Sequence, residues 1–522
     1  MLINITPRPY QTDILKTCIE KSCLVVLPTG LGKTLIALML AHERLTKHPR
    51  SKILFLAPTR PLAEQHLAYF KKHLPELYAD MQIFTGKINA SERRKIWQTA
   101  DIIFSTPQCI GNDIKNNLYS LSEVSLLIED ECHRCFKNYA YTAIAKNYNE
   151  ISPTPRVLGL TASPGSEKSK IKEICQNLGI EAVEIRTRDS SDVKPYLQHL
   201  AIEAIKVDFP QELEEIRLLI HPLYKKKVEE LQNRKVLFKP ATKTFLLECQ
   251  AIIMKSISSG NKNMNMFAAA SACAQAIKLQ HLLELLETQT LSSTGTYIEK
   301  LLSEAAESKS KASKQLANQP NFAKARALLA SLLSDKKEHP KLSILKDFVQ
   351  KEMQTPETKI IVFSQYRDTV SKISAELNSI EGVKAKVFVG QQKRGNTGLN
   401  QKEQQAIIRE FSTGEINILC ATSIGEEGLD IPEVNAVILY EPVPSAIRQI
   451  QRRGRTARLM KGKLIILVTK NTRDEAYYWS AFHKEKKMHS ALNSIKEEIE
   501  AGTFDISNKD KPKTFHQQEK LP

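Results

Sequence analysis

The sequence predicts an α/β protein in which two domains with parallel β-sheets flank a helical domain. Short, almost continuous apolar runs alternate with amphipathic stretches over residues 22–187, and the same rhythm returns over residues 359–469. Near-continuous apolar strands separated by helices are typical of parallel sheets that are covered on both faces. Between these regions, from about residue 206 to residue 335, the strand signal disappears. A chain of 522 residues also exceeds what one hydrophobic core supports, so several domains are expected.

The domain boundaries follow from these changes in composition. We expect the first α/β domain to cover residues 1–205, the helical domain residues 206–335 and the second α/β domain residues 336–490. The polar, proline-containing end, residues 491–522, is expected to be a disordered tail.

The helical domain is predicted from a stripe of apolar residues at alternating spacings of four and three. The stripe consists of Ala272, Ala276, Leu279, Leu283 and Leu286. Such spacing marks the buried face of an amphipathic helix. Two lysine-rich stretches, residues 224–239 and 307–326, lie in the same domain, and we expect the second to form a loop. Their lysines fit either a solvated surface or contacts with phosphate groups.

The overall charge favours a polyanionic partner. The formal net charge is +17, and no strongly basic amphipathic helix with an apolar face stands out, which favours nucleic acid over a membrane surface. A generally basic surface without such a partner is the alternative. The N-terminal stretch lacks the pattern of a signal peptide, and the longest apolar runs are far shorter than a membrane span. Nine cysteines without a framework spacing indicate reduced thiols in a cytoplasmic protein.

The stretch LPTGLGKT, residues 27–34, has the composition of a phosphate-binding loop between a strand and a helix. Its glycines allow backbone N–H groups to point at phosphates, Lys33 can reach the β- and γ-phosphate oxygens, and Thr34 offers a hydroxyl group to Mg²⁺. The strict pattern has glycine where this chain has Leu27. The nucleotide-binding candidates of the loop are Thr29, Gly30, Gly32, Lys33 and Thr34.

Two adjacent carboxylates, Asp130 and Glu131, end an apolar strand of the same domain. A carboxylate there can hold the Mg²⁺ that Thr34 also contacts, and its neighbour can accept a proton from the water that attacks the γ-phosphate. Two solvated acids at a strand end are the alternative, which the phosphate loop upstream disfavours. We therefore predict Thr34 and Asp130 as Mg²⁺ ligands and Glu131 as the general base.

Cys132, His133 and Cys135 follow directly, with a C-x-x-C spacing that can bind a metal or form a redox dithiol. A closed zinc site needs four ligands, and no second C-x-x-C or H-x₃-H stands nearby. A redox dithiol would need a thioredoxin-like setting, which this strand context does not provide. We interpret the two cysteines as small, half-buried side chains beside a nucleotide site.

A second chemical cluster lies in the late α/β domain, where QRRGRTAR, residues 451–458, places four arginines on a helix. Arginines presented from a facing domain can stabilise the charge on a γ-phosphate in the transition state. A solvated helix face is the alternative.

Ten short segments, taken in order along the chain, resemble the motifs of superfamily 2 helicases. In the first α/β domain they are RPYQ (8–11), LPTGLGKT (27–34), APTRPLAEQ (57–65), FTGK (84–87), STPQ (105–108), DECH (130–133) and TAS (161–163). In the second they are VFSQYRDT (362–369), ATSIGEEGLD (421–430) and QRRGRTAR (451–458). GLTASPGS, LQHLLELLETQ and TRDEAYYW are further similar to the archaeal fork-structure helicase Hef and its relatives, the Fanconi anaemia group M translocases. The resemblance covers residue 8 to about residue 490.

The resemblance implies two RecA-like motor domains around a helical insert, and it implies roles for individual residues. Contacts with the adenine and ribose fall to Arg8, Gln11, Gly428 and Asp430. Contacts with the γ-phosphate fall to Gln451, Arg455 and Arg458. Together with Lys33, Asp130 and Glu131, these residues make up the implied catalytic set. Coupling of the ATP state to the grip on the strand falls to His133, Thr161 and Ser163. Contacts with the backbone of the DNA strand fall to Thr59, Arg60, Gly86, Thr106, Arg367 and Thr422.

The function that the resemblance implies is that of an ATP- and Mg²⁺-dependent helicase or translocase. It would move 3′→5′ on branched DNA, such as replication forks and Holliday junctions, in DNA repair and fork restart. Besides DNA, a separate nuclease or a sliding clamp is an expected partner, a membrane is not, and the expected location is cytoplasmic and nucleoid-associated. Two alternatives stay open: an ATPase or helicase activated by double-stranded RNA, and a non-catalytic scaffold that binds branched DNA.

Three features depart from the family pattern. DECH stands where Hef-like proteins usually have DEAH, and cysteine there is also common in relatives that sense duplex RNA. Ala457 stands where glycine is usual. The nuclease domain and helix-hairpin-helix units of full-length Hef are not expected in this chain, and ERRK at 92–95, which superficially resembles that nuclease core, is assigned no catalysis.

Overall fold

The chain is described from a computed structural model. It covers residues 3, 5–75, 77–198, 200–260, 263–355, 357–390, 398–423, 431–453 and 462–505. At positions 446, 449, 451 and 453, only the backbone is described.

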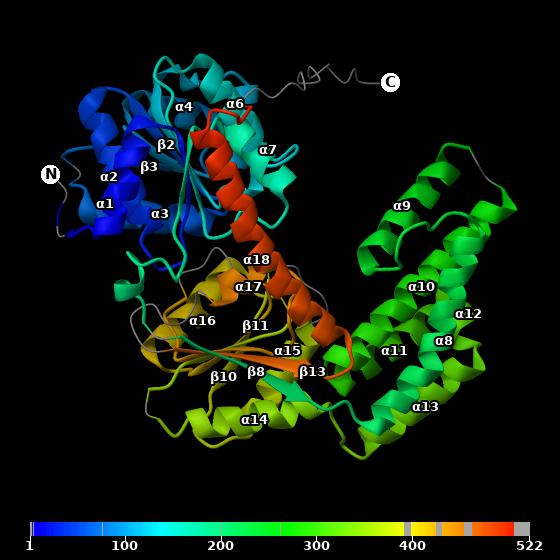
Figure 1. Cartoon of the computed structure of the whole chain (residues 1–522). Helices are drawn as coiled ribbons and strands as arrows, with labels where there is room; N and C mark the ends of the chain where they lie inside the picture. Colours follow the sequence, from blue (N-terminus) through cyan, green and yellow to red (C-terminus); the bar gives the residue numbers. More distant parts are fainter. Residues whose placement is uncertain are drawn as a thin grey trace.

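The first α/β domain is built on a seven-stranded parallel sheet (Figure 1). In order across the sheet, the strands are β3 (Met81–Phe84), β4 (Ile102–Ser105), β2 (Lys52–Leu56), β5 (Val124–Asp130), β6 (Val157–Thr161), β1 (Cys23–Val26) and β7 (Ala182–Ile185). Successive side chains enter different cores, because Ile53 and Phe55 pack on one face while Leu54 and Leu56 pack on the other. This burial on both faces explains why the strands are apolar throughout.

Helices cover both faces of this sheet. They are α1 (Pro9–Glu20), α2 (Lys33–Lys47), α3 (Arg60–His73), α4 (Ala90–Thr99), α5 (Pro107–Lys115), α6 (Ala140–Ile151) and α7 (Lys168–Leu178). Short 3₁₀ turns are η1 (Leu121–Glu123), η2 (Cys132–Arg134) and η3 (Lys194–Tyr196). Proline stands in the first turn of α3 and α5, where its missing N–H has no helical partner to lose.

The helical insert lies between the two α/β domains in the chain. Its helices are α8 (Gln211–Asn233), α9 (Lys243–Ser258), α10 (Met264–Thr288), α11 (Leu291–Ala306), α12 (Lys311–Ala317) and α13 (Pro320–Ser334). The predicted apolar stripe is buried along α10. The expected loop at 307–326 is wrong, because α12 and the start of α13 occupy most of it and bury Leu316, Phe322 and Ala325 against the insert core.

The second α/β domain is built on a six-stranded parallel sheet. Across it, the strands are β10 (Ala385–Phe388), β11 (Ile418–Ala421), β9 (Ile360–Phe363), β12 (Ala436–Leu439), β13 (Gly462–Thr469) and β8 (Leu200–Val207). Its helices are α14 (Pro340–Glu352), α15 (Arg367–Leu377), α16 (Gln401–Thr413), α17 (Ala446–Arg453) and α18 (Arg473–Glu500). The boundary expected at residue 205 falls inside β8, so the start of this edge strand belongs to the second sheet although it precedes the insert. Two parallel-sheet domains around a helical insert confirm the predicted fold class.

Helix α18 begins in the second α/β domain and ends on the first (Figure 1). Its last turns bury Leu492 and Ile495 in the core of the first domain. Lys168 Nζ lies 2.8 Å and Lys172 Nζ 2.6 Å from the Glu498 carboxylate. The disordered tail expected from residue 491 is therefore wrong for residues 491–500, which are helical because their apolar face covers the first domain; residues 506–522 lie outside the described part.

The carboxyl end of α10 fixes the insert to the second α/β domain. Lys243 Nζ donates to Glu284 Oε2 over 2.8 Å and lies 3.4 Å from the Tyr366 hydroxyl, and His281 Nδ1 lies 3.6 Å from the same carboxylate oxygen. Burial alone would raise the pKa of Glu284, but the polar contact with His281 and the charge and hydrogen bond of Lys243 outweigh burial and lower this pKa to about 2. The carboxylate is thus held charged at the junction.

Replacing Glu284 with Gln is expected to lower the unfolding free energy at pH 7 by about 3 kcal/mol. This is the free energy that corresponds to the difference between the pKa of Glu284 in the folded and in the unfolded chain. Because the folded-state pKa is depressed, this stabilisation is complete above the unfolded-state value of 4.5 and is lost as the pH falls through the folded value. Denaturant midpoints of wild type and Glu284→Gln should therefore converge as the pH is lowered toward 2. A difference that stays constant from pH 7 to pH 3 would contradict the assignment.

A fully buried ion pair lies where α10, α14 and α18 meet. Lys341 and Asp474 contact each other, both side chains are 0% exposed, and Lys341 Nζ also donates to the Thr288 carbonyl over 3.1 Å. Burial raises the pKa of Asp474, and the charge of Lys341 opposes that rise. The Thr469 N–H donates to Asp474 over 3.0 Å, so the pair is also tied to the end of β13.

Across the part of the chain that is described, no helix has both the length and the apolar composition that crossing a bilayer requires.

Candidate active site

The predicted phosphate loop connects β1 to the N-terminus of α2. Gly30 and Gly32 have φ values of 86° and 83°, the left-handed region that glycine tolerates, and Gly32 caps α2. Lys33 Nζ donates to the Leu27 carbonyl over 2.9 Å, which draws the side chain back across the loop. The loop therefore presents a helix N-terminus and an ammonium group on the same side, the arrangement that favours a bound phosphate.

The segment around Arg8 covers this loop from the other side. Gln11 Nε2 donates to the Leu31 carbonyl over 3.0 Å, and a Cβ at Gly32 would lie 2.2 Å from that same nitrogen, so any larger residue there would displace the Gln11 side chain and be strained at a φ of 83°. Gln11 Oε1 accepts from the Arg8 N–H over 2.8 Å. The Arg8 guanidinium lies 4.9 Å from the ring centroid of Tyr196, a residue that the sequence did not single out. The structure thus brings Gln11 into contact with the loop and Arg8 beside Gln11, while their contacts with the adenine stay a prediction.

Asp130 ends β5 with its carboxylate buried beside His66. His66 Nε2 lies 2.8 Å from Asp130 Oδ2, and the Tyr141 hydroxyl donates to the Asp130 carbonyl over 2.7 Å. Burial would raise the pKa of Asp130, but the hydrogen bond and charge of His66 and the charge of Lys33 lower it. An anionic carboxylate next to the phosphate loop is the ligand type that Mg²⁺ prefers. His66 follows the segment APTRPLAEQ directly, and only this adjacency in sequence points to it.

A series of polar contacts runs from Glu131 in the first domain to helix α18, which starts in the second domain. Glu131 adopts the left-handed φ of 51°, and its Oε2 lies 3.2 Å from His133 Nδ1, which lies 3.3 Å from Thr161 Oγ1. The Ser163 N–H donates to Thr161 Oγ1 over 3.1 Å, and Ser163 Oγ lies 2.9 Å from the sulfur of Met488 in α18. The three predicted coupling residues are therefore in contact with one another and with a helix that starts in the second domain.

Cys132 and Cys135 are fully buried, more so than the half-buried positions predicted. Burial raises the pKa of both thiols well above the ordinary range. A Cβ at Gly159 of β6 would lie 3.2 Å from Cys132 Sγ, so this thiol fills a tight space against the neighbouring strand. Thiols held neutral in an apolar core are poor metal ligands and poor nucleophiles.

Helix α17 of the second domain lies against the strand ends that carry this site. Ile450 packs in the same core cluster as Val26, the last residue of β1, and Ala162, which follows β6. A Cβ at Gly165 would lie 4.0 Å from Ile447 Cδ1. The helix that opens the arginine segment thus faces the phosphate loop.

The structure describes only part of the predicted arginine cluster. Arg452 is turned into the second domain, where its guanidinium lies 5.0 Å from the ring centroid of Phe363, so it does not face the cleft as a helix of four anion-binding arginines would require. Burial raises the pKa of Glu441 in the same core to about 7, against the opposing charge of Arg452. Predicted residues outside the described part are Gly428, Asp430, the side chain of Gln451, Arg455 and Arg458.

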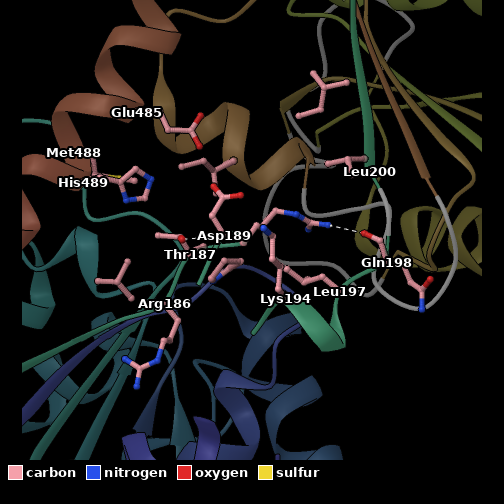
Figure 2. A pocket seen from close by; sticks show the side chains of 16 residues that line it. Arg186, Thr187, Asp189, Lys194, Leu197, Gln198, Leu200, Glu485, Met488 and His489 are labelled. Atoms are coloured by element: carbon pink, nitrogen blue, oxygen red, sulfur yellow. Dashed lines mark hydrogen bonds between the residues drawn. The ribbon is translucent and has the colours of Figure 1, made fainter. Parts of the chain in front are cut away.

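A cavity of about 530 Å³ lies between the phosphate loop, the linker after β7 and helices α17 and α18 (Figure 2). Pro28 of the loop contributes to its wall. Figure 2 shows Glu485, Met488 and His489 reaching in from α18, opposite Lys194 of the linker. Both domains therefore line one cavity beside the predicted nucleotide site.

The predicted strand-contact residues of the first domain follow three neighbouring strands, where parallel strands end on one edge of the sheet. Thr59 follows β2 and caps α3, Thr106 follows β4 and caps α5, and Gly86 follows β3 with open space where a Cβ would be. Arg60, the first residue of α3, donates to Glu64 over 2.7 Å. Helix N-termini along one edge offer backbone N–H groups to successive phosphates.

In the second domain the corresponding residues follow the adjacent strands β9 and β11. Arg367 is the first residue of α15 and donates to the Gly390 carbonyl over 3.1 Å. Thr422 follows β11 and is buried. As in the first domain, the predicted strand-contact residues thus follow the ends of neighbouring strands in the sheet.

Three family models match successive parts of the chain. "Type III restriction enzyme, res subunit" matches residues 4–166, "Putative ATP-dependent RNA helicase, helical bundle" matches residues 212–337, and "Helicase conserved C-terminal domain" matches residues 340–460. These are the phosphate-loop domain, the insert and the second α/β domain.

The chain is also similar to a solved structure and to curated proteins. The Hef helicase domain of Pyrococcus furiosus is 45% identical, with a TM-score of 0.69 over 91% of this chain and 98% of that one. A "Putative ATP-dependent RNA helicase" of Methanocaldococcus jannaschii is 40% identical over 94% of this chain, and the ATP-dependent DNA helicase fml1 of Schizosaccharomyces pombe is 31% identical over 96%. The chain spans about three fifths of the length of these two curated relatives, 61% and 60%. Since it matches nearly all of the Hef helicase domain at this identity, the chain belongs to the family of ATP-hydrolysing superfamily 2 helicases that contains Hef and the Fanconi anaemia group M proteins.

Proposed function

We propose that this chain is an ATP-driven motor that moves 3′→5′ along one strand of branched DNA, such as a replication fork or Holliday junction, in DNA repair and fork restart. The observation that carries the proposal is the position of α17, whose Ile450 and Ile447 pack beside the strand ends that lead into the phosphate loop. A nucleotide on that loop would contact both α/β domains. Binding and hydrolysis would therefore close and release the two domains in turn.

Within this site, each residue has a physical task. Lys33 and the N-terminus of α2 would bind the β- and γ-phosphates, and Arg8 and Gln11 would orient the base. Thr34 and Asp130 would hold Mg²⁺, which would neutralise phosphate charge. Glu131, which lies 3.2 Å from His133, would take a proton from the attacking water.

Coupling between hydrolysis and movement would pass along the contacts from Glu131 to α18. His133, Thr161 and Ser163 connect the general base to Met488, so a change at the γ-phosphate would shift a helix shared by both domains. The edge residues Thr59, Arg60, Gly86, Thr106, Arg367 and Thr422 would hold the strand backbone. Contacts with phosphates rather than base edges carry little sequence preference.

The nucleic acid that activates the motor separates this proposal from its closest rival, a double-stranded-RNA-activated ATPase. Because relatives include a protein named as an RNA helicase and one named as a DNA helicase, both substrates need to be compared directly. ATP hydrolysis is expected to be stimulated more by forked DNA than by linear duplex DNA, and more than by double-stranded RNA of equal length. Steady-state ATPase assays at fixed ionic strength measure this, since binding through phosphates is strongly salt-dependent. Stronger stimulation by RNA would overturn the choice of substrate.

A nuclease acting in trans or a sliding clamp is proposed as an additional partner, at a cytoplasmic, nucleoid-associated location. Both follow from the proposed work on branched DNA. Co-purification of the chain with chromosomal DNA after nuclease-free lysis, compared with nuclease-treated lysate, tests the location.

A further inference from the structure

One aromatic side chain of the insert is held in solvent by a well-anchored loop. Phe238 lies in the loop 234–242 between α8 and α9 and is 85% exposed. Its neighbour Leu237 is buried in the core between α8, α9 and α10. The Tyr224 hydroxyl donates to the Ala241 carbonyl over 2.6 Å at the other end of the loop. Anchors on both sides fix the backbone, so the exposed ring is presented in a defined position.

The loop that carries this ring is rich in basic residues. Residues 231–247 contain no acidic residue, and their basic residues are Arg234, Lys235, Lys239 and Lys243. Three of these four pair with carboxylates outside the stretch, Arg234 with Glu230, Lys239 with Glu248 and Lys243 with Glu284. Lys239 Nζ lies 4.6 Å from the ring centroid of Phe245, so aromatic rings and cations alternate along this part of the insert. A large apolar ring flanked by lysines is poorly suited to a hydrophobic protein surface and well suited to nucleic acid, which offers phosphates beside stackable bases.

The loop leads directly to the junction with the second α/β domain. Lys243, the first residue of α9, lies 3.4 Å from the Tyr366 hydroxyl, and the next residue, Arg367, is a predicted contact of the DNA strand. In Figure 1, α9 lies on the side of the insert that faces the first α/β domain. Phe238 is five residues from Lys243, a span of at most about 18 Å. The ring is thus within reach of nucleic acid that follows the proposed path.

We propose that Phe238 stacks on a nucleobase exposed at the branch point of DNA, with the phosphates on either side held by the lysines of the loop. This inference rests on the proposed function and adds the contact by which the chain would recognise the branch point. In linear duplex DNA every base is already stacked between neighbours, whereas bases at a branch point have an unstacked face. An aromatic ring can satisfy that face at little cost in unstacking.

The test compares Phe238→Ala, Phe238→Trp and Phe238→Leu in the full chain. Dissociation constants are measured by fluorescence anisotropy with forked and linear duplex DNA, and a second fork carries 2-aminopurine at the branch point. Phe238→Ala should weaken fork binding about 5- to 100-fold, the range for loss of one base–aromatic stack. Phe238→Trp should restore it, Phe238→Leu should not, and linear duplex binding should change less than twofold. Wild type and Phe238→Trp, but not Phe238→Ala, should quench 2-aminopurine.

Leu218→Ala is the matched control, because Leu218 is a 62% exposed apolar residue on α8 outside the basic loop. It should leave all affinities unchanged. Equal fork affinity of Phe238→Ala and wild type, or full rescue by leucine, would overturn the stacking contact. Wild type that binds both DNAs equally would contradict branch recognition as the function, while a loss with Phe238→Ala on either DNA would still establish a base contact. Wild type that binds neither DNA would overturn both.

Discussion

Replacing Glu131 with Gln is expected to lower the rate of ATP hydrolysis by about 10²- to 10⁴-fold, the usual contribution of a positioned general base. The amide keeps the shape of the side chain and can still contact His133, 3.2 Å away, but it cannot accept the proton of the attacking water. Lys33, Thr34 and Asp130 are unchanged, so ATP binding should be retained. Steady-state hydrolysis and the binding of a fluorescent ATP analogue measure the two quantities separately.

The same variant decides between a motor and a non-catalytic scaffold. A scaffold that only binds branched DNA would tolerate Glu131→Gln in every assay. Glu20→Gln on the exposed end of α1 is the control for loss of one carboxylate in the same domain. Hydrolysis by Glu131→Gln within a factor of about three of the wild-type rate would remove the proposed general base and favour the scaffold.

Replacing Lys341 with Met is expected to lower the unfolding free energy of the second α/β domain by about 3–5 kcal/mol. The change leaves the Asp474 carboxylate buried without the ammonium group that compensates it, and the Thr288 carbonyl loses a donor. Because α10 carries that carbonyl, the attachment of the insert should weaken as well. Denaturant unfolding and limited proteolysis of the insert measure the two effects.

A double variant makes this prediction specific. Lys341→Met combined with Asp474→Leu removes both charges, so it should recover part of the loss, since an apolar replacement of a buried pair is often tolerated. Recovery should be incomplete because the Thr469 N–H also donates to Asp474. Lys346→Met on the same helix breaks a half-exposed pair with Glu376 and should change stability by less than about 1 kcal/mol. A loss for Lys341→Met as small as that control would contradict the prediction.

The sequence predicted the parts of the fold whose signals are local. Strands buried on both faces are apolar throughout, and the stripe on α10 repeats at helical spacing, so both could be recognised from neighbouring residues. Strand β8 reads LAIEAIKV and lies at a sheet edge, where only part of its side chains is buried. Its membership in the second sheet depends on pairing with β13, more than 250 residues later, which a local pattern does not contain.

The residues of the predicted site likewise divide into those with a local sequence signal and those that depend on contacts distant in sequence. Lys33, Asp130 and Glu131 could be singled out as candidates because their chemistry and spacing are compressed into short segments. His66 acts on Asp130 across 64 residues, Tyr196 faces Arg8 from the interdomain linker, and Met488 contacts Ser163 across 325 residues. Apart from the position of His66 directly after the segment APTRPLAEQ, none of these residues carries a signal in its own neighbourhood. The sequence also did not show that the Arg452 side chain points into the second domain. A helical pattern alone does not say which of its arginines faces the cleft.

Helix α18 has a practical consequence for dividing this protein. A fragment ending before the insert would contain the phosphate loop and both carboxylates, yet it would expose to water the apolar face that Leu492 and Ile495 normally cover. Such a piece should be poorly soluble and should gain solubility when a peptide of residues 473–505 is supplied in trans. The smallest autonomous ATP-binding unit of this chain is therefore discontinuous, with its final segment encoded some three hundred codons after the rest.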